Sequence, residues 1–232
     1  MNISPDEIVF IDWPGWGQLN ATIVYTWVVL FLLVFICRSI TAKLTSQTKI
    51  SRWQNTLETI VIVINNQIRE ISRQEPGRYL PFIGTIFIFI LTSNVLAVFP
   101  GFSPPTGSLS TTVALALSVF TAVPVYGIAQ NGIGKYLRSY IQPTLFMLPF
   151  NIIGEISRTL ALAVRLYGNM MSGTVIVAIL LGLVPLFFPV VMQLLGLITG
   201  VIQAYIFAVL ALVYITSASQ AQKNNQEMKG ER

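Results

Sequence analysis

Four long stretches of the chain contain no Asp, Glu, Lys or Arg, and this feature limits the possible folds more than any other. The stretches are 13–37, 79–134, 139–154 and 166–222. Hydrophobic residues make up 54% of the sequence and charged residues only 10%, whereas a soluble domain has about 25% charged residues. Because a spanning helix needs about 20 apolar residues, the sequence predicts an all-α integral membrane protein with about five membrane helices.

The apolar stretches place the elements of this protein along the chain. We expect a single polytopic membrane domain at 20–218, between an N-terminal segment, 1–19, and a polar tail, 219–232. The expected membrane helices lie at about 20–37, 80–99, 110–129, 143–184 and 190–218. One further helix is expected at about 52–72, where apolar residues recur on one face. Such an amphipathic helix is typical of segments that lie on a membrane surface.

The basic residues are distributed unevenly between the two sides of the predicted bundle. Of the 14 Lys and Arg residues, seven lie in 38–79, two in 130–142 and three in the tail, whereas 1–19 and 100–110 contain none. Short loops rich in Lys and Arg stay in the cytoplasm. The sequence therefore predicts an N-terminus outside the cell and a cytoplasmic C-terminus.

Cysteine and histidine usage excludes several kinds of enzyme. Cys37 is the one cysteine, and the sequence has no histidine. A disulfide within the chain, a zinc site of the HExxH kind and a Ser-His-Asp triad are thereby excluded. We expect no catalytic centre and no cofactor or metal bound by this chain.

Three charges lie inside the apolar zone, and all belong to the segment expected to form the long helix at 143–184. They are Glu155, Arg158 and Arg165. At 3.6 residues per turn they share about 100° of arc with three more residues. These three are Asn169, Ser172 and Gly173. A polar stripe on an apolar helix faces protein or water rather than lipid. Glu155 and Arg158, three residues apart, could also simply pair with each other.

Arg165 has no acidic residue within one helical turn. Its guanidinium stays protonated at physiological pH, so it cannot carry a proton. It can act as a fixed positive charge that lowers the pKa of a carboxylate on another chain and drives off the cation bound there. We therefore expect Arg165 to separate two cation pathways, with a purely structural role as the alternative.

A second polar set lies on the last expected helix, where Gly196, Thr199 and Gln203 share one face. Gln203 could support Arg165 across a helix hairpin or form an ordinary interhelical hydrogen bond. Asn169 could likewise cap a neighbouring helix. The small residues expected to allow close helix packing are Gly173, Gly196 and Gly200.

Several blocks of sequence resemble the a subunit of F-type ATP synthase, and particularly its plastid and cyanobacterial branch. The blocks are "RLYGNMMSG" (165–173), "IQAYIFAVLALVYI" (202–215), "YIQPTLFMLPFNIIGEISR" (140–158), "LPFIGTIFIFILTSN" (80–94) and "STTVALAL" (110–117). The resemblance implies a stator subunit whose two half-channels couple the flow of H⁺ or Na⁺ to rotation of a c-ring. It implies that Arg165 is the essential arginine and that Asn169 and Gln203 are its polar neighbours.

The same resemblance implies further features. The segments at 143–184 and 190–218 would form a long tilted hairpin against the c-ring, and the 52–72 helix would lie near the peripheral stalk. The partners would be the c-ring, the b subunits of the stalk, the rest of the ATP synthase complex and membrane lipid, with no nucleic acid. A bacterial plasma membrane is the expected location, or a thylakoid membrane in a cyanobacterium or plastid.

Two positions depart from the family pattern. Many members carry Glu or His at the position of Thr174, and many carry His or Glu at the position of Gly196, although plastid members have Gly there. Neither residue is ionisable in this chain, which leaves Glu155 as the candidate relay acid. The same loss resembles the divergent N-type branch of bacterial rotary ATPases, so both H⁺ and Na⁺ remain open.

Two other functions compete with this reading. A stand-alone cation channel or secondary transporter would be expected to show internal repeats and a cluster of ion-binding carboxylates, and neither is visible. An intramembrane enzyme is disfavoured by the missing histidine. The a-subunit reading is therefore preferred.

Overall fold

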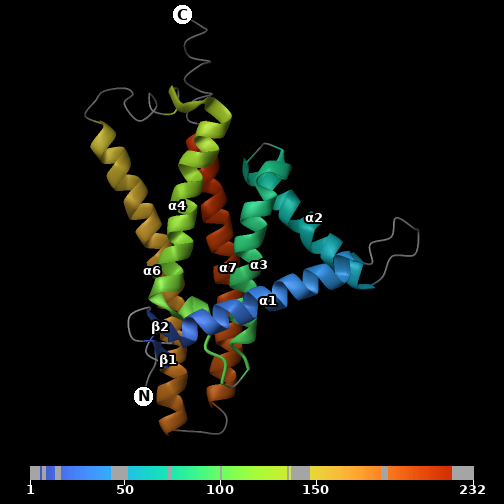
Figure 1. The fold of residues 1–232 in the computed structure, drawn as a ribbon, viewed down its shortest axis with the longest axis vertical. Helices are drawn as coiled ribbons and strands as arrows, with labels where there is room; N and C mark the ends of the chain where they lie inside the picture. Colours follow the sequence, from blue (N-terminus) through green and yellow to red (C-terminus); the bar gives the residue numbers. More distant parts are fainter. Residues whose placement is uncertain are drawn as a thin grey trace, which may run out of the picture.

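The computed structural model shows an elongated, mostly helical molecule (Figure 1). The residues that it describes are 6, 9–13, 17–42, 52–72, 75–99, 101–134, 136, 147–183 and 188–220. Parts of the expected segments 1–19, 143–184 and 219–232 lie outside these residues.

Four helices run along the long axis of the molecule and form its bundle (Figure 1). They are α3 (Leu80–Leu96), α4 (Leu109–Asn131), α6 (Met147–Leu183) and α7 (Phe188–Gln220). Helix α7 packs against each of the other three. The start of α4 follows from its sequence, because the Ser108 hydroxyl accepts a hydrogen bond from the Thr111 amide, as an N-cap does. Gly132, with φ 78°, ends the same helix.

Within the described residues, α1 (Ala21–Thr41), α4, α6 and α7 are long and apolar enough to cross a membrane, and α3 is a shorter apolar helix of 17 residues. This composition confirms the predicted all-α membrane fold. Helices α6 and α7 have 37 and 33 residues. At 1.5 Å per residue they measure about 55 Å and about 50 Å, against a hydrocarbon core of about 30 Å. Helices of this length fit a bilayer when they tilt or extend beyond it.

Helices α1 (Ala21–Thr41) and α2 (Arg52–Ser72) extend from one side of the bundle. In Figure 1 α1 crosses the direction of α4 and α7, and α2 returns from its far end toward the upper part of α3. The amphipathic pattern of α2 explains its position, because Ile64, Ile68 and Ile71 pack against the hydrophobic core while Ile62 and Val63 stay exposed.

A short β-hairpin precedes α1, and the sequence interpretation did not anticipate it. Strand β1 (Val9–Trp13) pairs antiparallel with β2 (Gly17–Asn20). Register places Asp12 opposite Gln18 and Trp13 opposite Gly17. The expected N-terminal segment is therefore partly structured, and the hairpin leads directly into α1.

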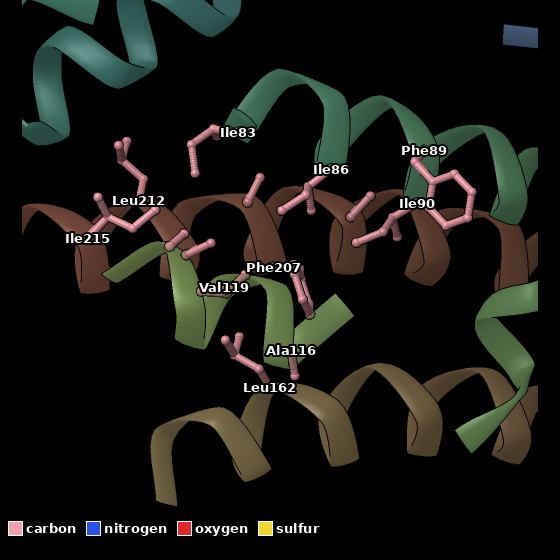
Figure 2. Packing of buried hydrophobic residues seen from close by; sticks show 14 of the residues in the cluster. Ile83, Ile86, Phe89, Ile90, Ala116, Val119, Leu162, Phe207, Leu212 and Ile215 are labelled. Atoms are coloured by element: carbon pink, nitrogen blue, oxygen red, sulfur yellow. The ribbon is translucent and has the colours of Figure 1, made fainter. Parts of the chain in front are cut away.

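The hydrophobic core is centred on α7, as Figure 2 shows. Phe207, Leu212 and Ile215 of α7 meet side chains from three other helices. These side chains include Ile83, Ile86 and Ile90 of α3, Ala116 and Val119 of α4, and Leu162 of α6. Because lipid tails are as apolar as these residues, close van der Waals packing holds such helices together in a membrane.

Candidate functional site

Two contacts set the register of the antiparallel pair α6 and α7. The Asn169 amide donates to the Thr199 carbonyl oxygen over 3.4 Å. Toward the other end, the Arg158 guanidinium lies 5.7 Å from the centroid of the Tyr214 ring. Arg165 precedes Asn169 by four residues, and Gln203 follows Thr199 by four. In an antiparallel pair this spacing places Arg165 and Gln203 at the same level.

Arg165 lies on the outer face of α6 and is exposed. It makes no hydrogen bond or ion pair with the part of the chain that the structure describes. Its neighbours on this face are apolar, since Leu160 is 60% exposed and Val164 is 54% exposed. A permanent charge on an apolar membrane surface is costly without a partner. Its partner is therefore expected on another chain.

Gln203 faces the interior of the bundle and is only 5% exposed. Its Nε2 atom is buried and has no hydrogen-bond partner among the described residues. An unsatisfied buried amide costs about 1–3 kcal/mol. The donor is thus available to water or to a polar group that enters this level of the bundle.

The opposite end of the polar stripe holds Glu155 and Arg158. Glu155 is half-buried and Arg158 is exposed. Arg158 lies over the Tyr214 ring in a cation–π contact. This contact joins α6 to α7, and the pairing of Glu155 with Arg158 stays a prediction.

A cavity of about 270 Å³ lies at the other end of the pair, between α6, α7, the end of α3 and the segment after it. Its polar lining residues are Asn94, Asn169, Thr174, Gln193 and Thr199. None of its lining residues is ionisable. Across the described residues, no three His, Cys, Asp or Glu side chains gather in a group that could hold a metal ion. The polar side chains of the cavity are therefore neutral hydroxyls and amides, and the rest of its lining is mostly apolar.

The hydroxyl groups of the site donate within their own helices. Ser172 donates to the Asn169 carbonyl over 3.0 Å, and Thr174 donates to that of Met171 over 2.9 Å. Thr199 donates to the Gly196 carbonyl over 3.0 Å. Each hydroxyl oxygen keeps its acceptor capacity. Thr174 and Thr199 present these acceptors at the cavity, whereas Ser172 is exposed on α6.

The three glycines expected at close helix contacts differ in their surroundings. A Cβ atom on Gly200 would lie 3.0 Å from Cβ of Asn94, so α3 and α7 approach closely there. At Gly173 and Gly196 an added Cβ would meet nothing within 4 Å. Both of these glycines line the cavity instead, and they make no close helix contact with the residues that the structure describes.

The sequence interpretation missed a buried polar pair, Asn94 and Thr106, which are 2% and 0% exposed. Thr106 donates to Oδ1 of Asn94 over 2.7 Å, and the Asn94 amide donates to the Gly200 carbonyl over 2.8 Å. Asn94 therefore joins the segment after α3 to α7. The available signal was the single asparagine Asn94 in an apolar helix, because asparagine side chains form hydrogen bonds between membrane helices.

Comparison with known proteins identifies the family of this chain. The family model described as ATP synthase A chain matches residues 23–216. This match covers most of the chain, including α3, α4, α6 and all the site residues described above.

Full-length relatives agree with this match. "ATP synthase subunit a 2" of Acaryochloris marina is 58% identical over 231 residues, with 100% of this chain and 98% of the relative covered. "ATP synthase subunit a" of Albidiferax ferrireducens is 55% identical over 228 residues, covering 98% of each chain. "ATP synthase subunit a 1" of Chlorobaculum parvum is 55% identical over 225 residues, covering 97% and 99%. The chain therefore belongs to the ATP synthase A chain family, the non-catalytic ion-translocating membrane subunits of F-type ATP synthases.

Proposed function

We propose that this chain supplies two offset cation half-channels to a c-ring and that Arg165 is the fixed charge that separates them. The observation that carries the proposal is the position of Arg165. It is exposed and unpaired among the described residues, on a helix that has polar regions on both sides of it along the chain. The cavity and the Glu155–Arg158 region are these two polar regions.

The spacing along α6 keeps the two regions apart. At 1.5 Å per residue, Asn169 at the cavity lies about 6 Å along the helix from Arg165, and Arg158 lies about 10 Å away in the other direction. A cation that enters one region cannot reach the other without passing the guanidinium. A carboxylate on a moving partner can carry the cation around this barrier instead.

The chemistry at Arg165 is electrostatic. When a partner carboxylate approaches the guanidinium, the positive charge favours the ionised form and lowers the pKa of that carboxylate. The cation bound there is released into one half-channel. The carboxylate takes up a new cation only after it has moved past Arg165 to the other half-channel. Gln203, at the same level, offers an uncharged donor that leaves this charge balance unchanged.

The outer face of α6 suits a c-ring as its partner. Its large apolar residues Ile153, Leu160 and Val164 are exposed. Small exposed residues recur along the same helix, and they allow another helix to approach closely. These residues are Ser157, Ala161, Gly168 and Ser172. We assign the b subunits of the peripheral stalk as further partners, with α2 as the neighbouring element.

The distribution of basic residues orients the protein in this proposal. The N-terminal segment 1–19 lies outside the cytoplasm and the tail 219–232 lies inside, in a bacterial plasma membrane or a thylakoid membrane. In Figure 1 the β1–β2 hairpin lies at the same end of the molecule as the α3–α4 connection. The cavity is then the extracytoplasmic half-channel, and Glu155 with Arg158 belongs to the cytoplasmic one.

The transported ion is H⁺ or Na⁺. The cavity lining has no carboxylate or histidine that could relay a proton, so protons would cross it through water. The oxygens of Asn94, Thr174 and Thr199 are the hard ligands that Na⁺ prefers. Both ions are compatible with Glu155 on the cytoplasmic side.

The test is ATP-driven uptake of radioactive sodium by proteoliposomes that hold the whole complex, with and without a protonophore. Uptake that persists or rises with protonophore identifies a sodium motor. A protonophore-sensitive pH gradient without sodium uptake identifies a proton motor. Transport of either ion that continues unchanged in Arg165→Ala would contradict the proposed role of Arg165.

A further inference from the structure

The carboxylate of Asp6 fastens the N-terminal segment to two helices. It accepts hydrogen bonds from Thr22 of α1 over 2.6 Å and from Ser108 at the start of α4 over 2.7 Å and 2.8 Å. Ser110 donates to it over 3.1 Å and 3.2 Å. A charge-assisted hydrogen bond is about twice as strong as a neutral one. Asp6 therefore holds α1 and the start of α4 together.

Tyr25 makes a second link between α1 and the same region. Its hydroxyl donates to the carbonyl oxygen of Gly101 over 3.0 Å. Its ring meets the Phe102 ring edge-on, with 4.8 Å between the ring centroids. Gly101 and Phe102 both line the 270 Å³ cavity, so Tyr25 contacts the cavity wall from outside.

The segment between α3 and α4 is thus held at three points. Tyr25 binds it at Gly101, Asn94 binds it at Thr106, and Asp6 binds it at Ser108. Gly101 has φ 90°, a conformation that few residues other than glycine adopt. A wall of this kind keeps its shape only while its attachments hold, because the segment has little regular structure of its own.

We propose that Asp6 and Tyr25 are positioning residues that fix the α3–α4 segment and thereby set the width of the extracytoplasmic half-channel. Neither residue lines the cavity, so neither needs to bind the transported ion. The inference rests on the proposed function, because it takes the cavity as the path by which the ion enters from that side.

The first experiment measures the shape of the cavity without measuring ion transport. Thr174→Cys in a Cys37→Ser background places one thiol at the cavity, and its reaction rate is followed with a methanethiosulfonate that carries an ammonium group. When Tyr25→Phe is introduced into this chain of the whole complex, it removes only the hydroxyl that binds Gly101. The rate at which the thiol reacts with the methanethiosulfonate should then change severalfold. Tyr205→Phe is the matched control, because the Tyr205 hydroxyl donates to Gln67, between α7 and α2.

Asp6→Asn tests the other attachment in the same assay. The Asn side chain keeps a hydrogen-bond acceptor but lacks the negative charge, so the complex should still assemble. The amount of this chain in the purified complex measures this assembly. Asp6→Asn and Ser108→Ala should each change the labelling rate, and the double variant should change it little further. Effects that simply add would overturn the role of the Asp6–Ser108 contact.

The second experiment measures ATP synthesis driven by an imposed gradient of the ion that the uptake experiment identifies. Tyr25→Phe should raise the apparent KM for the ion on the extracytoplasmic side and leave the rate at saturation nearly unchanged. An unchanged labelling rate in both Tyr25→Phe and Asp6→Asn would overturn the inference. A changed labelling rate with an unchanged KM would support the positioning role of Asp6 and Tyr25. It would overturn the assignment of the cavity as a half-channel.

Discussion

Helices α6 and α7 are similar in length and apolar character, yet they are buried in the molecule to different extents. Phe207, Ala211 and Ile215 of α7 are 0% exposed. On α6, Leu160 and Val164 are mostly exposed, and Arg165 is exposed beside them. Helix α7 is therefore the centre of the bundle, and in the proposed function α6 is the surface that meets a partner.

The placement of polar groups explains this division better than hydrophobicity does. In a membrane, an apolar side chain is tolerated equally well against lipid or protein. Polar groups are costly against lipid and so decide which face points inward. Gln203 and Thr216 of α7 are buried inside the bundle, whereas the two cations of α6, Arg158 and Arg165, are exposed. In the proposed function, another chain contacts α6 at these exposed cations.

The largest effect is expected when the outward charge of α6 is removed. Arg165→Ala should abolish ATP-driven ion transport by the reconstituted complex, because a partner carboxylate then has no fixed charge to meet. The amount of this chain in the complex should stay normal, because Arg165 has no partner in the described bundle. Loss of assembly together with transport would show that Arg165 is structural.

A core substitution in α7 should act on stability instead. Phe207→Ala leaves a cavity where the side chain is fully buried, and such truncations cost about 3–5 kcal/mol. We expect this chain to dissociate from the purified complex at a lower temperature than the wild-type chain does. Phe150→Ala on α6 is the matched control, because Phe150 is 69% exposed. Equal losses for both variants would remove the contrast between the helices.

Glu155→Gln tests the second polar region of α6 with a smaller expected effect. If Glu155 relays ions in the cytoplasmic half-channel, the transport rate should fall severalfold in the proteoliposome assay while assembly stays normal. Tyr214→Leu removes the ring beneath Arg158 and serves as a comparison at the same level. An unchanged rate in Glu155→Gln would leave Glu155 with a structural role.

The smallest effect is expected from added methyl groups. Gly200→Ala places a Cβ atom 3.0 Å from Cβ of Asn94, and overpacking of this kind costs about 1–3 kcal/mol. Transport and thermal stability should both fall modestly. Gly182→Ala on α6 adds the same group where nothing lies within 4 Å and should change neither. A stability loss of equal size in both variants would contradict the close contact of α3 with α7.

Local sequence patterns predicted the helices well because each pattern is read within one segment. The apolar recurrence at 52–72 matches α2, which begins at Arg52 and ends at Ser72. The spacing of Arg165 and Asn169 placed them on one side of a helix. The β-hairpin was missed, although "WPGWG" at 13–17 contains turn-forming residues, because its strands have only five and four residues.

Contacts between distant segments could not be predicted in the same way. Asn94 and Gly200 are 106 residues apart, and Asp6 and Ser108 are 102 residues apart. Nothing in a single sequence identifies such partners. The polar stripe on α6 was visible from its period, but its division into an exposed part at Arg165 and a cavity-lining part at Asn169 depends on how α7 packs beside it.

Passive ion leak tests the role of Arg165 most directly. Proteoliposomes would hold the membrane sector without its catalytic part, and the flux of Na⁺ and H⁺ down an imposed gradient would be measured for three forms. These are the wild type, Arg165→Ala and Arg158→Ala, which removes the same charge from the same helix. A fixed charge between two half-channels predicts increased leak in Arg165→Ala alone. Equal leak in all three forms would contradict the account.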